Sequence, residues 1–544
     1  MNRYSVILVT YLVSMILVAG VITPTLFSAA YAGTTIMVNS TADVLNGNDG
    51  QCTLREAVIA ANNDASSGPG PGECPAGSGV DTITFVDSGA PTIYTLTIVG
   101  AGEDAAATGD LDITEALTIR GHGQAMTIIE AMPGYRDRVF HILDTGAAGD
   151  EARFEELTIR NGDVLNTGNG GGILNANASR LAIISSTLSN NRASHGGAIV
   201  NEGGTVRLAN GSLVQNQASN QGGGIFNTGF GTVTLDETIL RNNTAVSGGG
   251  IFNEDGVVIL RNTTVDDNTA SSGPGGGVLS GGILTIFDST LSGNNANEVG
   301  GAILSVPSPT GTLTIAGSTL TQNVSGLDGG GIFNGGGQMT ISSTTLDNNL
   351  ADNGGGIYSS GTVTMTNSTL SQNQALAAFG GGIYNDGPST SIAVLTNTTL
   401  AQNEAAVNGA GLYNDGAAVT LINTIAAENT PGGDCFNNSG SIADAGHNLD
   451  SDTTCGFAPP SIAGGNANLG PLQANGGPTQ THALQDGSQA IDTGNNSVCP
   501  ATDQRGEQRP QDGDGSGAPI CDIGAYERAT IYKGYLPFIS SDGN

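Results

Sequence analysis

Gly222-Gly223-Gly224-Ile225-Phe226-Asn227 is the stretch that decides the fold, because close copies of it recur along the chain. Each copy has two or three glycines, then an aliphatic residue, a bulky residue and often an asparagine. The aliphatic residue falls, at intervals of 25 to 29 residues, at Ile173, Ile199, Ile225, Ile251, Val278, Ile303, Ile332, Ile357, Ile383 and Leu412. Self-similarity with such a period is the sequence signature of a solenoid, in which each repeat forms one coil.

A second motif, Ser-Thr-Leu or a close variant, lies about a dozen residues before the aliphatic position. Its copies include Ser186–Leu188, Ser289–Leu291, Ser318–Leu320, Ser368–Leu370 and Thr398–Leu400. Alternating runs such as Val233-Thr234-Leu235 and Val363-Thr364-Met365 precede it. Alternation with a period of two is typical of a strand with one buried face, and no segment of the repeats keeps the 3.6-residue period of a helix. Each repeat is therefore predicted to hold two or three short strands.

Short strands of this kind bury their apolar face when they wind into a coil and stack on the next repeat. The sequence therefore predicts an all-β fold, a parallel β-helix with about 25–27 residues per coil. A right-handed winding is expected because parallel crossovers are almost always right-handed. Glycine is expected at the corners because it adopts positive φ without strain, and asparagine is the next most tolerant residue. The recurrent asparagines are also expected to hydrogen-bond from coil to coil.

Composition and charge limit the class of protein and its partners. With 85 glycines and 4% aromatic residues the chain is too poor in large side chains for several compact cores, yet at 38% hydrophobic residues it is too apolar for disorder. Its 16 basic and 49 acidic residues give a net charge of −33, which argues against nucleic acid or an anionic membrane as partner. Cations, neutral polysaccharides and surface proteins are the partners that this charge still allows.

Residues 1–32 have the pattern of a secretory signal peptide. Arg3 gives a basic start, Val6–Ile22 is apolar, and Ala30-Tyr31-Ala32 matches a cleavage site. The apolar stretch is long for a signal, so an uncleaved membrane anchor is the alternative; with either, the rest is exported to the cell surface or secreted. No other stretch approaches the ~20 apolar residues that a span needs, so no membrane span is expected in the mature chain.

Six cysteines form three local pairs in the sequence. The pairs are Cys52 with Cys74, Cys435 with Cys455, and Cys499 with Cys521. None has the CxxC spacing of a zinc or redox site. Each pair is predicted to close a loop in an oxidising compartment, although six cysteines allow fifteen connectivities.

Both flanks of the repeats are expected to cap the open ends of the rod. Residues 33–100 are predicted to form an N-terminal cap, in which Thr53-Leu54-Arg55-Glu56 is a capping box at the start of a short amphipathic helix that plugs the first coil. The segment Cys52–Ala57, with Thr53 in place of serine, resembles the signature of the CSLREA domain, and Asp137–Phe140 is also similar to that group. The resemblance implies the N-terminal part of a bacterial surface β-helix protein.

The glycine motifs are also similar to the GGA[ILV] repeats of chlamydial polymorphic outer-membrane proteins, although the phenylalanine motif of that family is replaced here by leucine or threonine. Residues 101–430 are assigned to the β-helix on the strength of the repeats. This second resemblance implies the same fold and a place on the cell surface.

After Leu412 the repeat ends, and residues 431–530 are predicted to form a C-terminal module. Four segments resemble, over about 60 residues, the choice-of-anchor Q domain of exported proteins: Leu469–Thr479, Ala490–Gly494, Asp503–Gly506 and Cys521–Glu527. The tail, 531–544, contains Tyr535-Leu536-Pro537-Phe538-Ile539 and lacks an LPxTG-like signal. That departure leaves the mode of anchoring open.

A stripe of aromatic residues is the main candidate for binding. Tyr358, Tyr384 and Tyr413 occupy one repeat position, and Phe226, Phe252 and Phe333 occupy it in other coils. If the preceding aliphatic residue points inward, strand alternation turns these rings outward, where they are expected to serve sugars or a protein partner. The alternative is that the rings pack into a corner. An adhesin-like binding or structural display element is the leading interpretation.

The rival interpretation is a carbohydrate-active enzyme. A lyase for acidic sugars is disfavoured because Lys and Arg are absent from 262–504. A glycoside hydrolase needs two close carboxyl groups, and Asp386 and Asp415 follow the same motif in neighbouring coils. The alternative is that both belong to Asn-Asp-Gly turns. No organic cofactor is expected.

Asp512-Gly513-Asp514-Gly515-Ser516-Gly517 is a candidate calcium loop, because closely spaced carboxylates and glycines suit an oxygen-rich flexible site. It lacks the glutamate of an EF-hand. A polar turn is the alternative.

Overall fold

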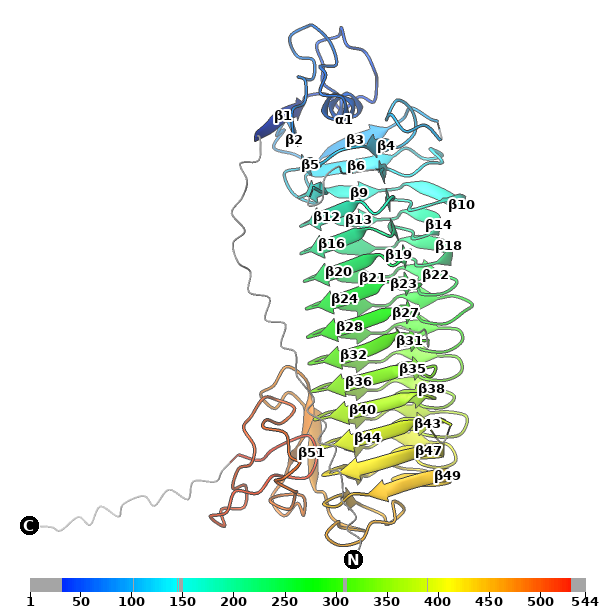
Figure 1. Ribbon diagram of the computed structural model, residues 1–544, viewed down its shortest axis with the longest axis vertical. Coiled ribbons are helices and arrows are strands. Elements are labelled where there is room, and N and C mark those ends of the chain that lie inside the picture. Colours follow the sequence, from blue (N-terminus) through cyan, green and yellow to red (C-terminus); the bar gives the residue numbers. More distant parts are fainter. Residues whose placement is uncertain are drawn as a thin grey trace, which may run out of the picture.

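The computed structural model describes residues 32–100, 102–143, 145, 150–306, 311–388 and 390–529. Nearly all of it is β-structure, wound into a parallel β-solenoid of about 13 turns (Figure 1). The predicted all-β solenoid is thus confirmed. The predicted signal peptide, apart from Ala32, and the predicted tail lie outside the described residues.

Each regular coil contributes strands to three sheets, of 26, 14 and 10 strands among the described residues. In one coil, β23 (Ile251–Asn253) and β24 (Val257–Arg261) belong to the 26-stranded sheet, β25 (Thr264–Asp266) to the 14-stranded sheet and β26 (Thr269–Ala270) to the 10-stranded sheet. The same four-strand order recurs in the next coil. The sheets therefore form the walls of a rod.

The repeated aliphatic residue marks the register of the coils. Ile225 pairs with Ile199 in the coil before and with Ile251 in the coil after, and all three are fully buried. The pairing continues without a break through Val278, Ile303, Ile332, Ile357, Ile383 and Leu412. These side chains belong to one core that runs along the rod, and burying each stabilises the fold by roughly 1.5–3 kcal/mol.

The glycine clusters are explained by backbone geometry at one corner. Gly222 has a φ of 67°, in the left-handed region, and a Cβ there would lie 2.3 Å from the carbonyl oxygen of Ile225. A Cβ on Gly223 would lie 2.3 Å from the carbonyl oxygen of Gly249 in the next coil. The first glycine thus permits the turn and the second permits close approach of the coils.

An asparagine ladder occupies the corner between the 14- and 10-stranded sheets. Each side-chain NH2 donates to the Oδ1 of the next member, 2.9 to 3.1 Å away, as between Asn268 and Asn294. The predicted hydrogen bonding between coils is confirmed for Asn191, Asn216, Asn243, Asn268, Asn294, Asn323, Asn349, Asn373, Asn403 and Asn429.

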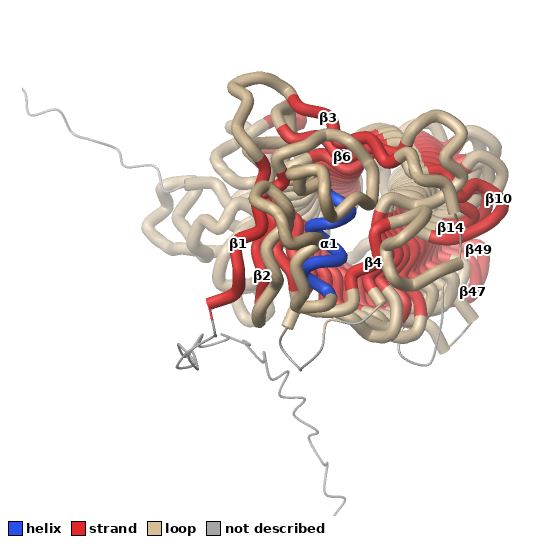
Figure 2. The backbone as a smooth tube through the Cα atoms, turned by 90° about the horizontal axis from the view of Figure 1, so that it is seen from above, coloured by secondary structure: helices blue, strands red, loops and turns tan. Residues whose placement is uncertain are grey.

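Helix α1 (Leu54–Asn62) covers the N-terminal end of the rod (Figures 1 and 2). Its N-cap is Thr53, and both hydrogen bonds of the predicted capping box with Glu56 are present. Arg55 is fully buried, pairs with Asp43 at 2.7 Å and donates to the hydroxyl of Tyr135 at 3.2 Å. The predicted plug helix is confirmed.

The stacked strands extend beyond the predicted range of 101–430 at both ends. Within the predicted cap, β1 (Ala32–Val38) pairs in parallel with β2 (Val80–Phe85), which pairs with β5 (Leu117–Arg120). At the other end, β49 (Cys435–Asp444) still pairs with β47 (Leu412–Ile422). These terminal coils lack the glycine motif, so the repeat alone did not delimit them.

The C-terminal module lies against the side of the rod, although it was expected to cap the end. Its strands β51 (Leu469–Gln473) and β52 (Thr481–Leu484) form an antiparallel pair beside the last coils (Figure 1). Thr345 donates to the Gln480 carbonyl at 2.6 Å, and Thr369 donates to Gln504 Oε1 at 2.7 Å. The physical reason is that outward threonines of the 14-stranded sheet offer hydroxyl groups along its flank.

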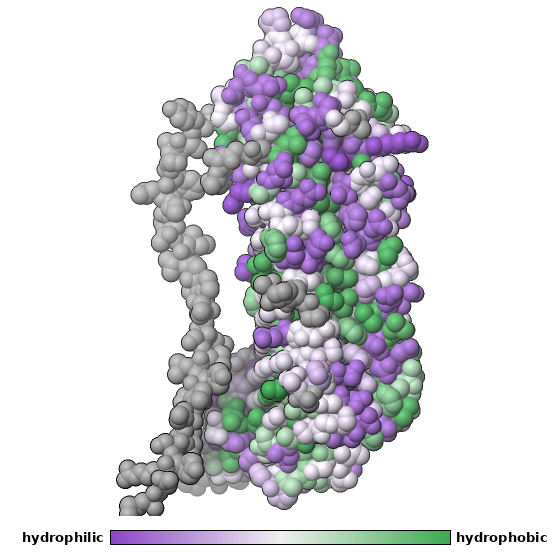
Figure 3. Space-filling view, turned by 45° about the vertical axis from the view of Figure 1, so that its right-hand side comes forward, coloured by the Kyte–Doolittle hydropathy of each residue, from purple (hydrophilic) through white to green (hydrophobic). Residues whose placement is uncertain are grey.

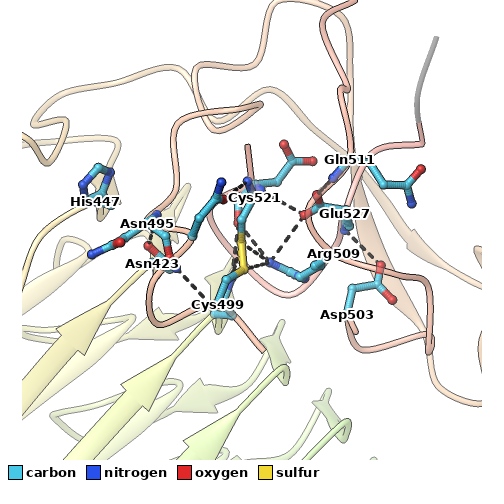
Figure 4. The surroundings of a disulfide bond; sticks show 12 residues. Asn423, His447, Asn495, Cys499, Asp503, Arg509, Gln511, Cys521 and Glu527 are labelled. Carbon is cyan, nitrogen blue, oxygen red and sulfur yellow. Dashed lines mark hydrogen bonds and ion pairs between the residues drawn. A yellow bond between two sulfur atoms is a disulfide. The ribbon is translucent and has the colours of Figure 1, made fainter. Parts of the chain in front are cut away.

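The three predicted cysteine pairs are bonded as Cys52–Cys74, Cys435–Cys455 and Cys499–Cys521. Figure 4 shows the last of these beside Arg509, whose guanidinium lies 3.6 Å from the carboxylate of Glu527. Both of those side chains are fully buried. Arg509 also donates to the Asp522 carbonyl at 3.0 Å, so this disulfide and ion pair form the interior of the module.

Within the described ranges, no helix combines the length and apolar character that crossing a membrane requires.

Candidate functional site

The predicted aromatic stripe forms a continuous stack in the C-terminal half of the rod. Its strands are β35 (Ile332–Asn334), β39 (Ile357–Ser359), β43 (Ile383–Asn385), β47 and β49. The centroid distances are 4.8, 4.8, 5.0 and 5.4 Å, with interplanar angles between 3° and 16°. We call this the ring ladder; it consists of Phe333, Tyr358, Tyr384, Tyr413 and Phe436.

Sequence analysis missed two aromatic residues of this surface. Phe436 continues the ladder, but it follows Cys435 and has no glycine motif before it. Phe379 comes from the loop before Gly380 and stacks on Tyr413 at 4.3 Å. The signal that finds Phe436 is the strand register, because Tyr413 and Phe436 are paired.

The other two predicted rings form a separate group. Phe226 and Phe252 lie 5.5 Å apart with a tilt of 34°. In the two following coils the same position holds Leu279 and Leu304, which separate this pair from Phe333. The six predicted residues are therefore not one uninterrupted stripe.

The rings present their edges to solvent more than their faces. Tyr413 is only 4% exposed and Phe226 8%, whereas Tyr358, Tyr384, Phe252 and Phe333 are partly exposed. Because the coil spacing of about 4.8 Å is also a good stacking distance, neighbouring rings cover one another's faces. A ligand on the ladder therefore meets ring edges and phenolic hydroxyls.

Acidic side chains accompany the ladder. Tyr358 donates its hydroxyl to the carboxylate of Asp386. Burial, and after it the nearby Asp386, raises the pKa of Tyr358 and of Tyr384. Both phenols therefore stay protonated and remain hydrogen-bond donors at neutral pH.

The two carboxylates considered as catalytic groups lie at this surface, and Asp415 is part of strand β47 rather than of the Asn-Asp-Gly turn considered as the alternative. Asp386 follows β43 and accepts the Tyr358 hydroxyl, while Asp415 accepts hydrogen bonds from Asn438 at 3.0 Å and Ser439 at 2.7 Å. Each thus has a hydrogen-bonding role where it stands. Their part in catalysis stays a prediction.

An apolar rim borders the ring ladder on the loops that lead into its strands. Leu327, Leu376 and Val407 are 47%, 59% and 49% exposed. Leu376 and Val407 lie in neighbouring coils, and the coil that separates them from Leu327 carries Asp352, whose backbone N–H donates to the Leu327 carbonyl. In Figure 3, apolar and polar side chains intermingle on one face of the rod, and hydrophilic ones gather towards its N-terminal end.

The predicted calcium loop is joined by a third carboxylate, Asp492. Ligand oxygens of Asp492, Asp512 and Asp514 lie within 4.8 Å of one another. Backbone N–H groups already donate to them, for example Asp514 to Asp492 at 2.7 Å and Ser516 to Asp512 at 2.9 Å. Calcium binding here stays a prediction, with Asp492 as an added ligand.

A pocket of about 400 Å³ near the N-terminal end was missed by sequence analysis. It is lined by acidic and basic groups, among them Glu103, Asp104, Asp110, Asp137, Arg138 and His141. Burial, with a smaller effect from Asp137, raises the pKa of Asp110 to about 8, although Arg138 lies 3.1 Å away. Asp110 therefore keeps a proton at neutral pH.

A histidine and a buried carboxylate meet at the same pocket. His141 Nδ1 lies 3.3 Å from Asp112 Oδ1, and Asp104 Oδ1 lies 4.0 Å away. Asp112 and His141 are register partners in β4 (Leu111–Ile113) and β7 (Phe140–Ile142). The only available sequence signal was the pair Asp110 and Asp112 around one apolar residue, in coils without the glycine repeat.

Comparison with protein-family models, curated proteins and solved structures gave no match. Function is therefore inferred from two surfaces of the molecule: the ring ladder with its acids and apolar rim, and the acidic pocket.

Proposed function

We propose that this protein is an exported rod, at the cell surface or outside the cell, that acts as an adhesin-like binding or display element. The ring ladder is its binding face. The observation that carries the proposal is the uninterrupted stack from Phe333 to Phe436, beside the exposed Leu327, Leu376 and Val407. Exposed apolar side chains beside a row of partly exposed rings are typical of interaction surfaces.

The ligand class follows from charge and hydrogen bonding. A net charge of −33 repels polyanions, and the ladder offers the Tyr384 hydroxyl as a donor beside Asp386, whose carboxylate already accepts the Tyr358 hydroxyl. A neutral polysaccharide is not repelled by this charge, and its hydroxyl groups can bond to the donors and acceptors of the ladder. The apolar faces of its sugar rings can pack on the apolar rim. A surface protein with an extended segment is the other ligand of this kind.

The resemblances support export. We infer that the N-terminal region is a CSLREA domain and the C-terminal one a choice-of-anchor Q domain of a bacterial surface β-helix protein, loosely similar to polymorphic outer-membrane proteins. Arg55 and Glu56 of the first signature make buried cap contacts, and Gln504 of the second hydrogen-bonds to Thr369. Three disulfides fit an oxidising compartment.

A glycan array probed with the mature chain, assayed in parallel for sugar release, tests the proposal. We expect binding without release. Tyr384→Ser should weaken binding at least about tenfold, the equivalent of about 1.4 kcal/mol, because it interrupts the ladder. Tyr384→Phe preserves the stack and should lose less. Thr285→Ser, on a neighbouring sheet face, is the matched control.

Unchanged binding of Tyr384→Ser would contradict the ladder as the binding face. Release of sugars would instead favour the second candidate, a carbohydrate-active enzyme. In its favour is the pocket lined by Asp110, Asp137 and His141, in which burial raises the pKa of Asp110 to about 8, a value suited to a general acid. If the pocket is the catalytic site, Asp110→Asn should abolish sugar release and Asp386→Asn should leave it unchanged. If the ladder is the catalytic site, the two effects should be reversed.

A further inference from the structure

Three carboxylates meet where the N-terminal cap joins the first coils. Asp64 follows the C-cap of α1, Asp81 is the second residue of β2, and Glu115 lies in the turn between β4 and β5. Ligand oxygens of the three lie within 4.8 Å of one another. The side chain of Asn62 holds this turn to the helix, donating to the Asp112 carbonyl at 2.7 Å and accepting from the Thr114 N–H at 3.1 Å.

The hydrogen bonding of this cluster is incomplete. Asp81 is fully buried, and its Oδ1 accepts backbone N–H groups from Thr34 at 2.7 Å and Ser78 at 2.9 Å. Its Oδ2 is buried without a hydrogen-bond partner, and so is Oε1 of Glu115. Among the ion pairs of the described residues, none links Asp64, Asp81 or Glu115 to a basic group.

The end of helix α1 adds further negative potential. The last turn of α1 carries no basic residue. Gly77 brings the cluster and the helix end together: a Cβ there would lie 2.2 Å from Asp81 Oδ2 and 3.0 Å from the Ala60 carbonyl oxygen. The C-terminal end of a helix carries about half a negative charge, so three carboxylates beside it repel one another and the helix. Burial, followed by Asp64 and Asp81, raises the pKa of Glu115 to about 7, in keeping with this repulsion.

We propose that Asp64, Asp81 and Glu115 bind a calcium ion that fastens helix α1 and the loop after it to the first coils. An all-oxygen set of carboxylates is the ligand type that Ca²⁺ prefers, and the loop residues Asp64 and Glu115 can adapt to its flexible coordination around Asp81 of β2. The ion supplies the positively charged partner that Asp81 Oδ2 and Glu115 Oε1 lack. The Cys52–Cys74 disulfide closes the same loop, so the two links act together.

This site differs from the other two acidic groups of the rod. The Asp492 group already accepts backbone N–H groups, and Asp104 and Asp112 lie beside His141. Neither therefore has the same combination of an all-carboxylate ligand set and a fully buried oxygen without a hydrogen-bond partner. The inference is independent of the proposed ligand binding at the ring ladder.

The test uses the mature, disulfide-bonded chain stripped with EDTA. Calcium chloride is titrated by calorimetry, and thermal unfolding is followed with and without the ion. We expect saturating Ca²⁺ to raise the unfolding temperature of the wild type. Asp81→Asn and Glu115→Gln should each weaken this binding at least about a hundredfold, since each removes a carboxylate ligand. The controls Asp514→Asn and Asp104→Asn, exposed carboxylates of the other two groups, should leave it intact.

A second measurement, the unfolding temperature without calcium, should change in the opposite direction. Without calcium, Asp81→Asn should unfold at a higher temperature than the wild type, because one repelling charge is gone while Oδ1 still accepts its two N–H groups. In an Asp514→Asn background, which disables the candidate calcium loop, calcium binding that survives both cap variants overturns the proposal. A wild type whose unfolding temperature does not respond to Ca²⁺ overturns it as well. Tighter binding of Mg²⁺ than of Ca²⁺ overturns the choice of ion. If Asp81→Asn does not fold, Glu115→Gln alone decides the matter.

Discussion

Each ladder asparagine is both donor and acceptor, so one substitution disturbs two neighbouring coils. Asn294 donates to the Val265 carbonyl at 2.8 Å and to Asn323 Oδ1 at 2.9 Å, and its own Oδ1 accepts two bonds from Asn268. All of these groups are buried. Leaving buried donors and acceptors unpaired costs about 1–3 kcal/mol each.

We therefore expect Asn294→Ala to lower the free energy of unfolding by at least about 3 kcal/mol, measured by urea denaturation. Asn295→Ala is the matched control, because Asn295 is the next residue and is exposed. It should change stability by less than about 0.5 kcal/mol. Equal effects of the two substitutions would show that the ladder contributes little.

Buried carboxyl groups make the stability depend on pH. Burial, with repulsion from neighbouring carboxylates, raises the pKa of Asp110 and of Asp522 to about 8. Between the unfolded value near 4 and about 8, the folded chain holds protons that the unfolded chain releases, so stability falls as pH rises through this window.

We expect the unfolding temperature to decrease from about pH 5 to about pH 8.5 in calcium-free buffer. The trend should persist in about 1 M salt, which screens repulsion between surface charges but not the burial of Asp110 and Asp522. Differential scanning calorimetry across this range measures it. A constant or rising unfolding temperature would be inconsistent with these raised pKa values.

At the scale of single residues, the sequence predicts the position of a side chain where that residue recurs once in each repeat. The inward aliphatic residue, the corner glycines and the ladder asparagines follow from the period. The period did not predict Phe436 or the pocket around Asp110. Their coils lack the glycine motif, and their neighbours in space come from separate segments of the chain. The sequence also could not predict how far Tyr413 is exposed, because its exposure depends on Phe379, whose ring stacks on it.

Among the elements, α1 was predictable because its capping box is local. The limits of the solenoid were not, because β1 and β49 join the sheets through register alone. The position of the C-terminal module also depends on tertiary contacts. Its Gly524 donates its N–H to the Asn423 carbonyl at 2.8 Å, and this contact fixes it on the rod.

Gly524→Ala should release the module from the rod. A Cβ there would lie 2.7 Å from Ile425 Cδ1 and 2.8 Å from Thr399 Oγ1, at a φ of 93°. Gly517→Ala is a close control, because it has a φ of 92° and open space around the Cβ. Both changes cost about 1–2 kcal/mol in backbone strain.

Only Gly524→Ala should therefore increase hydrogen exchange over residues 469–527 and expose Thr345 and Thr369 beneath them. Mass spectrometry of the exchanged peptides measures this. Equal protection in the two variants would mean that the module does not depend on the close packing around Gly524.

As a whole, the molecule is one rod whose coils are stacked in register from the cap to the module. Its stiffness is what would hold the ring ladder, the apolar rim and the acidic groups in fixed positions. These surfaces exist only if equivalent residues of successive coils lie directly beside one another.

Disulfide cross-linking tests this register most directly. Thr314 pairs with Thr340, and Thr340 pairs with Thr364, all on the outer face. Cysteines at 314 and 340 should lie about 4.8 Å apart and close a disulfide on mild oxidation, whereas cysteines at 314 and 364, two coils apart at about 10 Å, should stay free. Mass spectrometry of the oxidised, denatured chains should find that bond in the first variant alone; free thiols in both, or bonding in both, would contradict the stacked rod.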